Sequence, residues 1–196
     1  MSEWKGMILA KCDDFGIMFA PRHLLEENPK YRQIIPYVVF RDGDRYACFQ
    51  RVKGHEKRLS NKYTIGVGGH IDISDMEFAD QTSEESTLQT LIILAAQREI
   101  FEETLYEGAY FEDFKQIGTI ESSDTPVDCV HYGVVFELEL SKGGLSISMN
   151  DLKEPEMILI GYKTKEELME IIEVGDASPD SPQLESWSQI VVKNII

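Results

Sequence analysis

The sequence predicts an α/β fold in which helices pack on a mixed β-sheet. Segments rich in β-branched and aromatic residues alternate along the chain with segments of helical periodicity, which is typical of one interleaved core. A length of 196 residues, with 42% hydrophobic residues, suits one domain with a substantial core. We therefore expect a domain at 33–196 and an N-terminal extension, 1–32, that packs on it.

The first part of the chain is predicted to be mostly β-structure. A short strand at 15–20 and a helical turn at 21–28 belong to the extension. Strands at 34–40 and 46–52 then flank the dipeptide Asp42-Gly43, which is typical of a tight β-hairpin.

The later part combines helices with further strands. We expect a helix at 86–104, with Gly108 as a delayed stop because Leu105 cannot supply one. Thr164 and Glu167 form a capping box for another helix. The remaining predicted elements are three strands and a closing helix, at 116–120, 130–140, 157–162 and 185–195.

Charge and cysteine usage limit the classes of function. The 19 basic and 35 acidic residues give a formal charge of −16, which argues against a nucleic-acid polymer as partner but not against a small phosphorylated molecule bound through a cation. Cys12, Cys48 and Cys129 form no C-x-x-C pair, which suits a reducing compartment. No leader or membrane-length apolar run is evident, so we expect a cytoplasmic protein without a membrane partner.

Three glutamates share one face of the helix predicted at 86–104. Glu99, Glu102 and Glu103 stand at i, i+3 and i+4, where like charges repel by roughly 0.2–0.5 kcal/mol per pair. A hard divalent cation such as Mg²⁺ would offset this repulsion, because it is commonly held by carboxylates and substrate phosphates. A solvated acidic face is the alternative interpretation.

A glycine-rich turn, IGVGGHI at residues 65–71, precedes this helix. The turn, the helix and the run REIFEE at 98–103 together resemble the signature of the Nudix hydrolases, G-x5-E-x7-R-E-U-x-E-E-x-G-U, where U is aliphatic. Gly69 matches the opening glycine. The resemblance covers about 33–195 and implies the Nudix-like α/β/α sandwich.

The signature is interrupted in two places. Asp75 stands where the family has its first glutamate, and an insertion of about 15 residues separates it from Arg98. Leu105 stands where the family has its last glycine. The inserted stretch, 76–90, is either a solvated acidic loop or a lid that selects the substrate.

The Nudix resemblance implies a Mg²⁺-dependent pyrophosphohydrolase that cleaves a diphosphate linkage in a nucleoside diphosphate linked to a second group, or in a related phosphorylated metabolite. By that resemblance Glu99, Glu102 and Glu103 hold Mg²⁺, for which Mn²⁺ can substitute, and the Gly68 carbonyl is a further ligand. Arg98 orients the carboxylates by ion pairing.

Several roles stay open between alternatives. Arg58, Gly69 and His70 are candidate substrate contacts, and His131 is another, although a histidine beside a glycine turn often only makes structural hydrogen bonds. The general base is one of four acids: Glu102, Glu103, Glu154 or Glu156.

Two other functions are compatible with the sequence. A Nudix-fold module that senses a nucleotide without hydrolysing it tolerates the split signature. An isoprenyl diphosphate isomerase, a branch of the same fold, needs a catalytic cysteine, and Cys48 does not align with it convincingly. A homodimer is compatible with either function. No G-x-S-x-G elbow and no Walker loop occurs.

Overall fold

The computed structural model of the chain describes residues 6–12, 14, 16–52, 62–76, 87–140, 145, 155–178 and 181–196. The chain divides into two compact units. The first unit takes its residues from Met1–Tyr37, Gly68–Arg98 and Gly118–Val135. The second takes its residues from Val38–Val67, Glu99–Ile117 and Phe136–Ile196.

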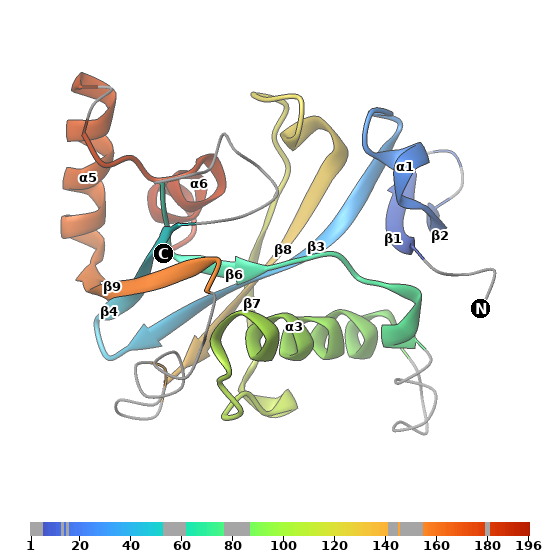
Figure 1. The fold of residues 1–196 in the computed structure, drawn as a ribbon, viewed down its shortest axis with the longest axis horizontal. Helices are drawn as coiled ribbons and strands as arrows, with labels where there is room; N and C mark the ends of the chain where they lie inside the picture. Colours follow the sequence, from blue (N-terminus) through green and yellow to red (C-terminus); the bar gives the residue numbers. More distant parts are fainter. Residues whose placement is uncertain are drawn as a thin grey trace. The chain divides into compact units, whose positions relative to one another are not determined.

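The described residues form a series of strands interspersed with helices (Figure 1). The strands are β1 (Met7–Cys12), β2 (Gly16–Pro21), β3 (Tyr31–Asp42), β4 (Arg45–Arg51), β5 (Tyr63–Thr64), β6 (Gly66–Gly68), β7 (Lys115–Ile120), β8 (His131–Glu139) and β9 (Met157–Thr164). The helices are α1 (Arg22–Leu25), α3 (Leu88–Thr104), α5 (Lys165–Ala177) and α6 (Ser186–Asn194), with 3₁₀ turns η2 (Phe111–Asp113) and η3 (Asp128–Val130). These strands belong to one sheet, and the predicted α/β fold with a mixed sheet is confirmed.

In the first unit, β1 and β2 form an antiparallel hairpin in which Cys12 lies opposite Gly16. Gly16 has a φ of 76°, a left-handed conformation that glycine adopts without steric cost. β1 also pairs antiparallel with the first part of β3, and the amide of Leu9 donates to the carbonyl of Ile71 over 2.9 Å. Strand β1 was not predicted from the sequence, and it supports the segment that follows the glycine turn.

In the second unit, β3 and β4 form the hairpin predicted at Asp42-Gly43. Asp42 pairs with Arg45, and Gly43 takes a φ of 67° in the turn between them. β4 pairs antiparallel with β9 along its whole length and with β5 near its end. The register shifts after Cys48, opposite Gly161, whose φ of 131° also requires glycine.

Aromatic rings fill the core of the second unit. The ring of Phe40 makes edge-to-face contacts with Phe49 and Tyr106, at centroid distances of 6.2 and 6.3 Å. Phe114 and Phe136 make a similar contact at 5.8 Å. Each such pair adds roughly 0.5–1.5 kcal/mol to the effect of burial alone. Tyr106 therefore anchors the chain two residues after the end of α3.

Helix α3 begins at Leu88, and its first turn is capped by Thr87, whose Oγ1 accepts from the amide of Thr90 over 3.1 Å. The helix ends at Thr104 as predicted, but the predicted delayed stop at Gly108 is wrong. Leu105 itself takes the left-handed conformation, with a φ of 54°, and its amide donates to the carbonyl of Phe101. A leucine thus occupies the backbone conformation that the family's glycine adopts easily.

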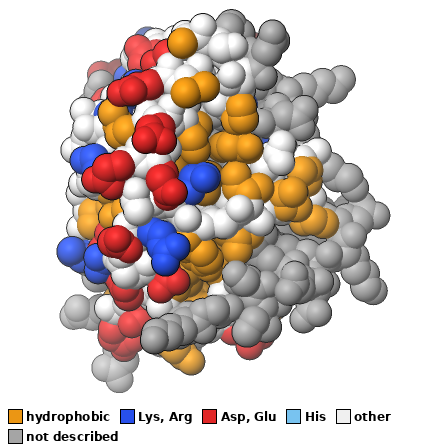
Figure 2. Space-filling view, turned by 90° about the vertical axis from the view of Figure 1, so that its left-hand side faces the viewer, with side chains coloured by type: hydrophobic (Ala, Val, Ile, Leu, Met, Phe, Trp, Pro, Cys, Tyr) orange, Lys and Arg blue, Asp and Glu red, His pale blue; other side chains and the backbone are white. Residues whose placement is uncertain are grey.

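The capping box at Thr164 and Glu167 is confirmed at the start of α5, with both reciprocal hydrogen bonds present. The helix continues to Ala177, and α6 then follows close to its predicted position. On the face drawn in Figure 2, acidic side chains gather beside basic ones and beside hydrophobic patches. No helix in the described part of the chain is long and apolar enough to cross a membrane.

Candidate active site

In the first unit, Arg98 and Asp75 join the two halves of the split signature. Arg98 donates from Nε to Asp75 Oδ1 over 2.8 Å and from Nη2 to Asp75 Oδ2 over 3.0 Å. Nη2 also donates to the carbonyl oxygen of His70 over 2.9 Å. Because Asp75 is only 5% exposed, this bidentate, charge-assisted pair lies in a largely dry environment. The insertion therefore does not separate Asp75 from its arginine partner.

A short helical turn at residues 73–76 presents Asp75 to Arg98. Asp72 Oδ1 accepts from the amide of Ser74 over 2.9 Å, and Asp75 Oδ2 accepts from the amide of Asp72 over 2.8 Å. These bonds cap the turn reciprocally. Asp72 is also bridged to Ile8 of β1, so the predicted extension helps to hold the turn.

The glycine turn passes very close to the backbone of β3. A Cβ atom at Gly68 would lie 2.1 Å from the carbonyl oxygen of Pro36, a distance that no other residue type could accept. Gly68 is therefore required for the path of the turn. The roles of its carbonyl as a metal ligand and of Gly69 as a substrate contact stay predictions.

His70 and His131 lie against each other, with their Nε2 atoms 3.4 Å apart. His131 Nδ1 lies 2.7 Å from the carbonyl oxygen of Val127, which can only accept, so Nδ1 carries the proton. Burial lowers the pKa of His70 to about 3, and the positive charges of Arg22, His131 and Arg98 lower it further. His70 is therefore a neutral imidazole at pH 7 and carries no positive charge.

In the second unit, the three glutamates of α3 differ in their surroundings. Glu102 is exposed and Glu99 is half-buried. Glu103 has a buried Oε2 atom that accepts no hydrogen bond from any described residue. An unpaired buried carboxylate oxygen is rare in folded proteins because it costs free energy.

The charges around Glu103 make this burial more costly. Burial is the main cause that raises the pKa of Glu103 to about 8. The positive charge of Arg51 lowers this pKa, and the negative charges of Glu99, Glu156 and Glu185 raise it. A divalent cation would neutralise these carboxylates and would give Oε2 a partner.

The fit to a metal ion is incomplete in the present arrangement. Across the described ranges, no three Asp, Glu, His or Cys side chains lie close enough to hold one ion together. The donor chemistry at Glu103, a carboxylate oxygen, fits Mg²⁺.

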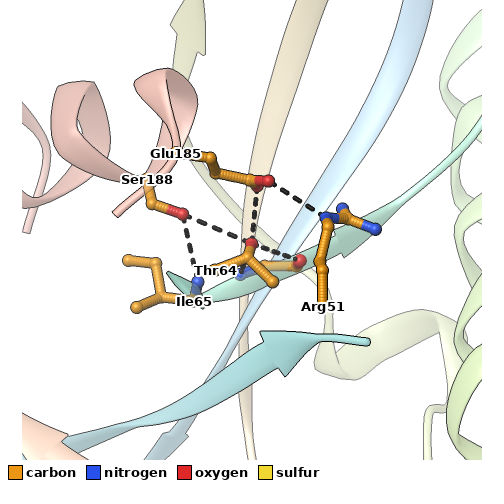
Figure 3. A network of polar contacts seen from close by, with 6 residues as sticks. Arg51, Thr64, Ile65, Glu185 and Ser188 are labelled. Carbon is orange, nitrogen blue, oxygen red and sulfur yellow. Dashed lines mark hydrogen bonds and ion pairs between the residues drawn. The ribbon is translucent and has the colours of Figure 1, made fainter. Parts of the chain in front are cut away.

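A polar cluster in the second unit was not predicted from the sequence (Figure 3). Glu185, at the start of α6, accepts from Arg51 Nε over 3.1 Å and from the hydroxyl of Thr64 over 2.6 Å. Ser188 joins the cluster through Thr64. Glu185 and Arg51 are 134 positions apart, and neither belongs to a recognisable motif, so no local pattern pointed to them.

Two predicted site residues, Arg58 and Glu154, lie outside the described residues, as does the part of the insertion at 77–86. Glu156 is described and exposed, and its charge acts on Glu103. The assignment of the general base stays open.

Cys48 does not fit the role that an isomerase would need. Its side chain is fully buried in β4, and burial raises the pKa of its thiol to about 12, against a smaller opposing effect of Lys163. A thiol in this environment is not ionised near neutral pH and is inert.

Comparison with known proteins places this geometry in a known fold. The chain resembles the solved structure of Tm1382, a candidate Nudix hydrolase, with 24% identity, a TM-score of 0.60 and coverage of 97% of this chain and 88% of that one. DR0079 from Deinococcus radiodurans aligns with 15% identity and a TM-score of 0.55, over 95% and 97% of the two chains. A MutT Nudix hydrolase from Burkholderia pseudomallei aligns with 15% identity and a TM-score of 0.51, over 84% and 98%.

The fold is therefore that of the Nudix proteins, as the sequence resemblance implied. At the sequence level, the chain is 31% identical over 170 residues to Protein YmaB of Bacillus subtilis (strain 168), covering 85% of this chain and 72% of that protein. The chain belongs to the same family as Protein YmaB. No protein-family model matches the sequence.

Proposed function

We propose that the protein is a Mg²⁺-dependent Nudix-type hydrolase that cleaves the diphosphate linkage of a nucleoside diphosphate joined to a second group, or of a related phosphorylated metabolite. The observation that carries the proposal is the buried Oε2 of Glu103, which lacks a hydrogen-bond partner among the described residues and lies within the field of other acids. A cation that takes oxygen ligands would satisfy this carboxylate, and Mn²⁺ would serve in place of Mg²⁺.

Each residue of the site has a distinct task in this proposal. Glu99, Glu102 and Glu103 would hold the cation, which would supply charge neutralisation at the phosphoryl group and activation of a water. Arg98 is a positioning residue, because it donates hydrogen bonds to Asp75 and to the His70 carbonyl and so holds these parts of the chain in place. His70 is a candidate substrate contact in this proposal.

The test is single-turnover cleavage of a panel of nucleoside diphosphate compounds by wild type and by Glu103→Gln, with folding checked by circular dichroism. Loss of one preorganised electrostatic contact typically lowers kcat by roughly 10²–10³. Glu107→Gln removes an exposed acid three residues after the end of α3 and is the control, for which we expect wild-type rates. Cleavage by folded Glu103→Gln at the wild-type rate, or full wild-type activity in excess chelator, would contradict the proposal.

A second candidate function is a nucleotide-sensing module that binds without hydrolysis. The interrupted signature, with Leu105 in place of its last glycine, is the feature of the chain that this candidate accommodates. A sensor would show no turnover by wild type over the same panel, and Glu103→Gln would then weaken binding of a nucleoside diphosphate without any rate to lose. The two functions therefore differ in the behaviour of the wild-type protein.

A further inference from the structure

Two basic side chains lie directly opposite each other on neighbouring strands of the first unit. Lys11 of β1 pairs with Arg32 of β3 in the antiparallel register. Side chains at such positions share one face of the sheet, with their Cβ atoms about 5 Å apart, and like charges there destabilise the pairing. In a chain with 35 acidic and only 19 basic residues, this pair is a local excess of positive charge that an anion would offset.

Tyr132 orients the ammonium of Lys11. Tyr132 belongs to β8, a strand that also pairs with β3 (Figure 1). The Nζ atom of Lys11 lies over the Tyr132 ring, 5.1 Å from its centroid, in a cation–π contact. This contact directs the ammonium across the sheet face but brings no negative charge, because the ring attracts a cation only through its quadrupole.

The guanidinium of Arg32 is held from one side. Its Nη1 atom donates to the carbonyl oxygen of Ser122 over 3.2 Å, and its Nε atom lies 3.5 Å from Glu121 Oε1. Its Nη2 atom donates no hydrogen bond to a described residue. Glu121 is 51% exposed, so water screens its carboxylate and the ion pair contributes little. Two cations beside one exposed carboxylate leave a net positive charge on this face.

A phosphate group is the anion that suits this pair of cations. A guanidinium presents N–H donors in a planar fork that matches phosphate oxygens, and a lysine ammonium adds a point charge with rotatable donors. A phosphate monoester carries about 1.5 to 2 negative charges at pH 7, so it balances both cations, whereas a carboxylate carries one charge. Because the protein supplies the positive charge, no divalent cation is needed.

We propose that Lys11 and Arg32 form a metal-independent binding site for a phosphate group, with Tyr132 as the positioning residue of the ammonium. The inference goes beyond the proposed function, because the site uses no residue of the Nudix signature and binds phosphate without a cation. Free inorganic phosphate and the phosphate end of a nucleotide share this chemistry, and the experiment distinguishes between them.

The experiment is an NMR titration of the isotope-labelled protein in excess chelator, at an ionic strength kept constant with NaCl because salt screens exposed charges. The probes are inorganic phosphate, AMP and adenosine. We expect phosphate and AMP to shift amide signals of β1, β3 and β8, and adenosine to leave them unchanged. A site for free phosphate binds phosphate and AMP with similar affinity, whereas a nucleotide site binds AMP more tightly.

Variants test each part of the site. Lys11→Met and Arg32→Gln should each weaken phosphate binding by about 10- to 100-fold, the range for a lost hydrogen bond to a charged group. Arg22→Gln is the matched control, because it removes the same charge from an exposed ion pair with Glu26 in the same unit and should leave the affinity unchanged. Tyr132→Phe keeps the ring and should bind like wild type, whereas Tyr132→Leu should bind more weakly.

Several outcomes would overturn the inference. Absence of phosphate-induced shifts in wild type does so, and so does an equal loss of affinity in Arg22→Gln and Arg32→Gln, because that result indicates a response to net charge alone. Adenosine binding as tight as AMP binding also overturns it. If Arg32→Gln does not fold, Lys11→Met, which keeps an unbranched side chain, decides the question. Since every titration is done in chelator, none of these results bears on the metal-dependent cleavage proposed above.

Discussion

Glu103 is the residue at which burial and charge conflict most strongly. Its carboxyl is desolvated, lies in the field of neighbouring acids, and has a pKa near 8 in the folded protein, compared with 4.5 for an ordinary glutamate. The free energy of unfolding therefore depends on whether Glu103 carries a proton or binds a cation. Neither condition can be read from the spacing of the three glutamates.

The first prediction concerns the pH dependence of metal-free protein. Between pH 5 and pH 8 the folded state retains a proton on Glu103 that the unfolded state has lost, so the free energy of unfolding should fall as pH rises. The fall reaches up to about 4 kcal/mol at pH 8, and Glu103→Gln should remove most of it. Urea unfolding in chelator at pH 5.5, 7 and 8 measures both proteins. Identical pH profiles would show that Glu103 does not cause the effect.

The second prediction concerns Asp75. Asp75→Asn leaves Arg98 in a half-buried position without its bidentate charge partner, and we expect a loss of about 2–3 kcal/mol in the free energy of unfolding. The control is Glu26→Gln, which breaks the exposed Arg22–Glu26 pair at 2.7 Å in the same unit and should cost less than about 0.5 kcal/mol. Chemical denaturation of both variants provides the comparison. Equal, small losses would mean that the Asp75 pair does not hold the signature together.

At the scale of the element, α3 ends in an unusual way. Leu105 adopts a φ of 54° where the Nudix signature has glycine, and a side chain in this region costs roughly 1–2 kcal/mol. The leucine is half-buried, so part of this cost is offset by packing.

The third prediction follows from this conformation. Leu105→Ala and Leu105→Gly both remove the half-buried side chain, but only glycine relieves the strained backbone. We therefore expect the glycine variant to be more stable than the alanine variant by about 1 kcal/mol, the reverse of the usual order within a helix. Thermal unfolding of the two variants side by side measures the difference. An alanine variant as stable as the glycine variant would contradict the assigned backbone conformation.

At the scale of the whole molecule, the formal charge of −16 affects every measurement of metal binding. Any salt screens repulsion among exposed acids, so a gain in stability on adding Mg²⁺ does not by itself identify a site. A specific site binds the folded state and stabilises it by mass action.

The fourth prediction uses this distinction. Mg²⁺ at ten times its dissociation constant should stabilise wild type by about 1.4 kcal/mol, which corresponds to a rise in Tm of a few degrees. NaCl at equal ionic strength should give a smaller rise. Glu103→Gln should respond to the two salts alike, because only screening is left. Differential scanning calorimetry measures the Tm of wild type and of Glu103→Gln in each salt. Equal Tm shifts for the two salts in wild type would count against a specific site.

Features that depend on neighbouring residues could be predicted from the sequence. Asp42-Gly43 predicted its hairpin, and Thr164 and Glu167 predicted their capping box. Both signals lie within a few positions of the chain, because turn conformation and capping are set by local sterics and local hydrogen bonds. The glycine turn at 65–71 and the run at 98–103 together predicted the Nudix fold through a sequence resemblance.

Contacts between distant side chains could not be predicted from the sequence, because they depend on the packing of the folded chain. The pairing of Asp75 with Arg98 across the insertion, and of Arg51 with Glu185 across 134 positions, depends on backbone segments that β1 and β5 hold in place. The left-handed conformation of Leu105 runs against the residue's own preference. These features follow from the packing of the whole chain, in which burial and long-range hydrogen bonds outweigh the preferences of single residues.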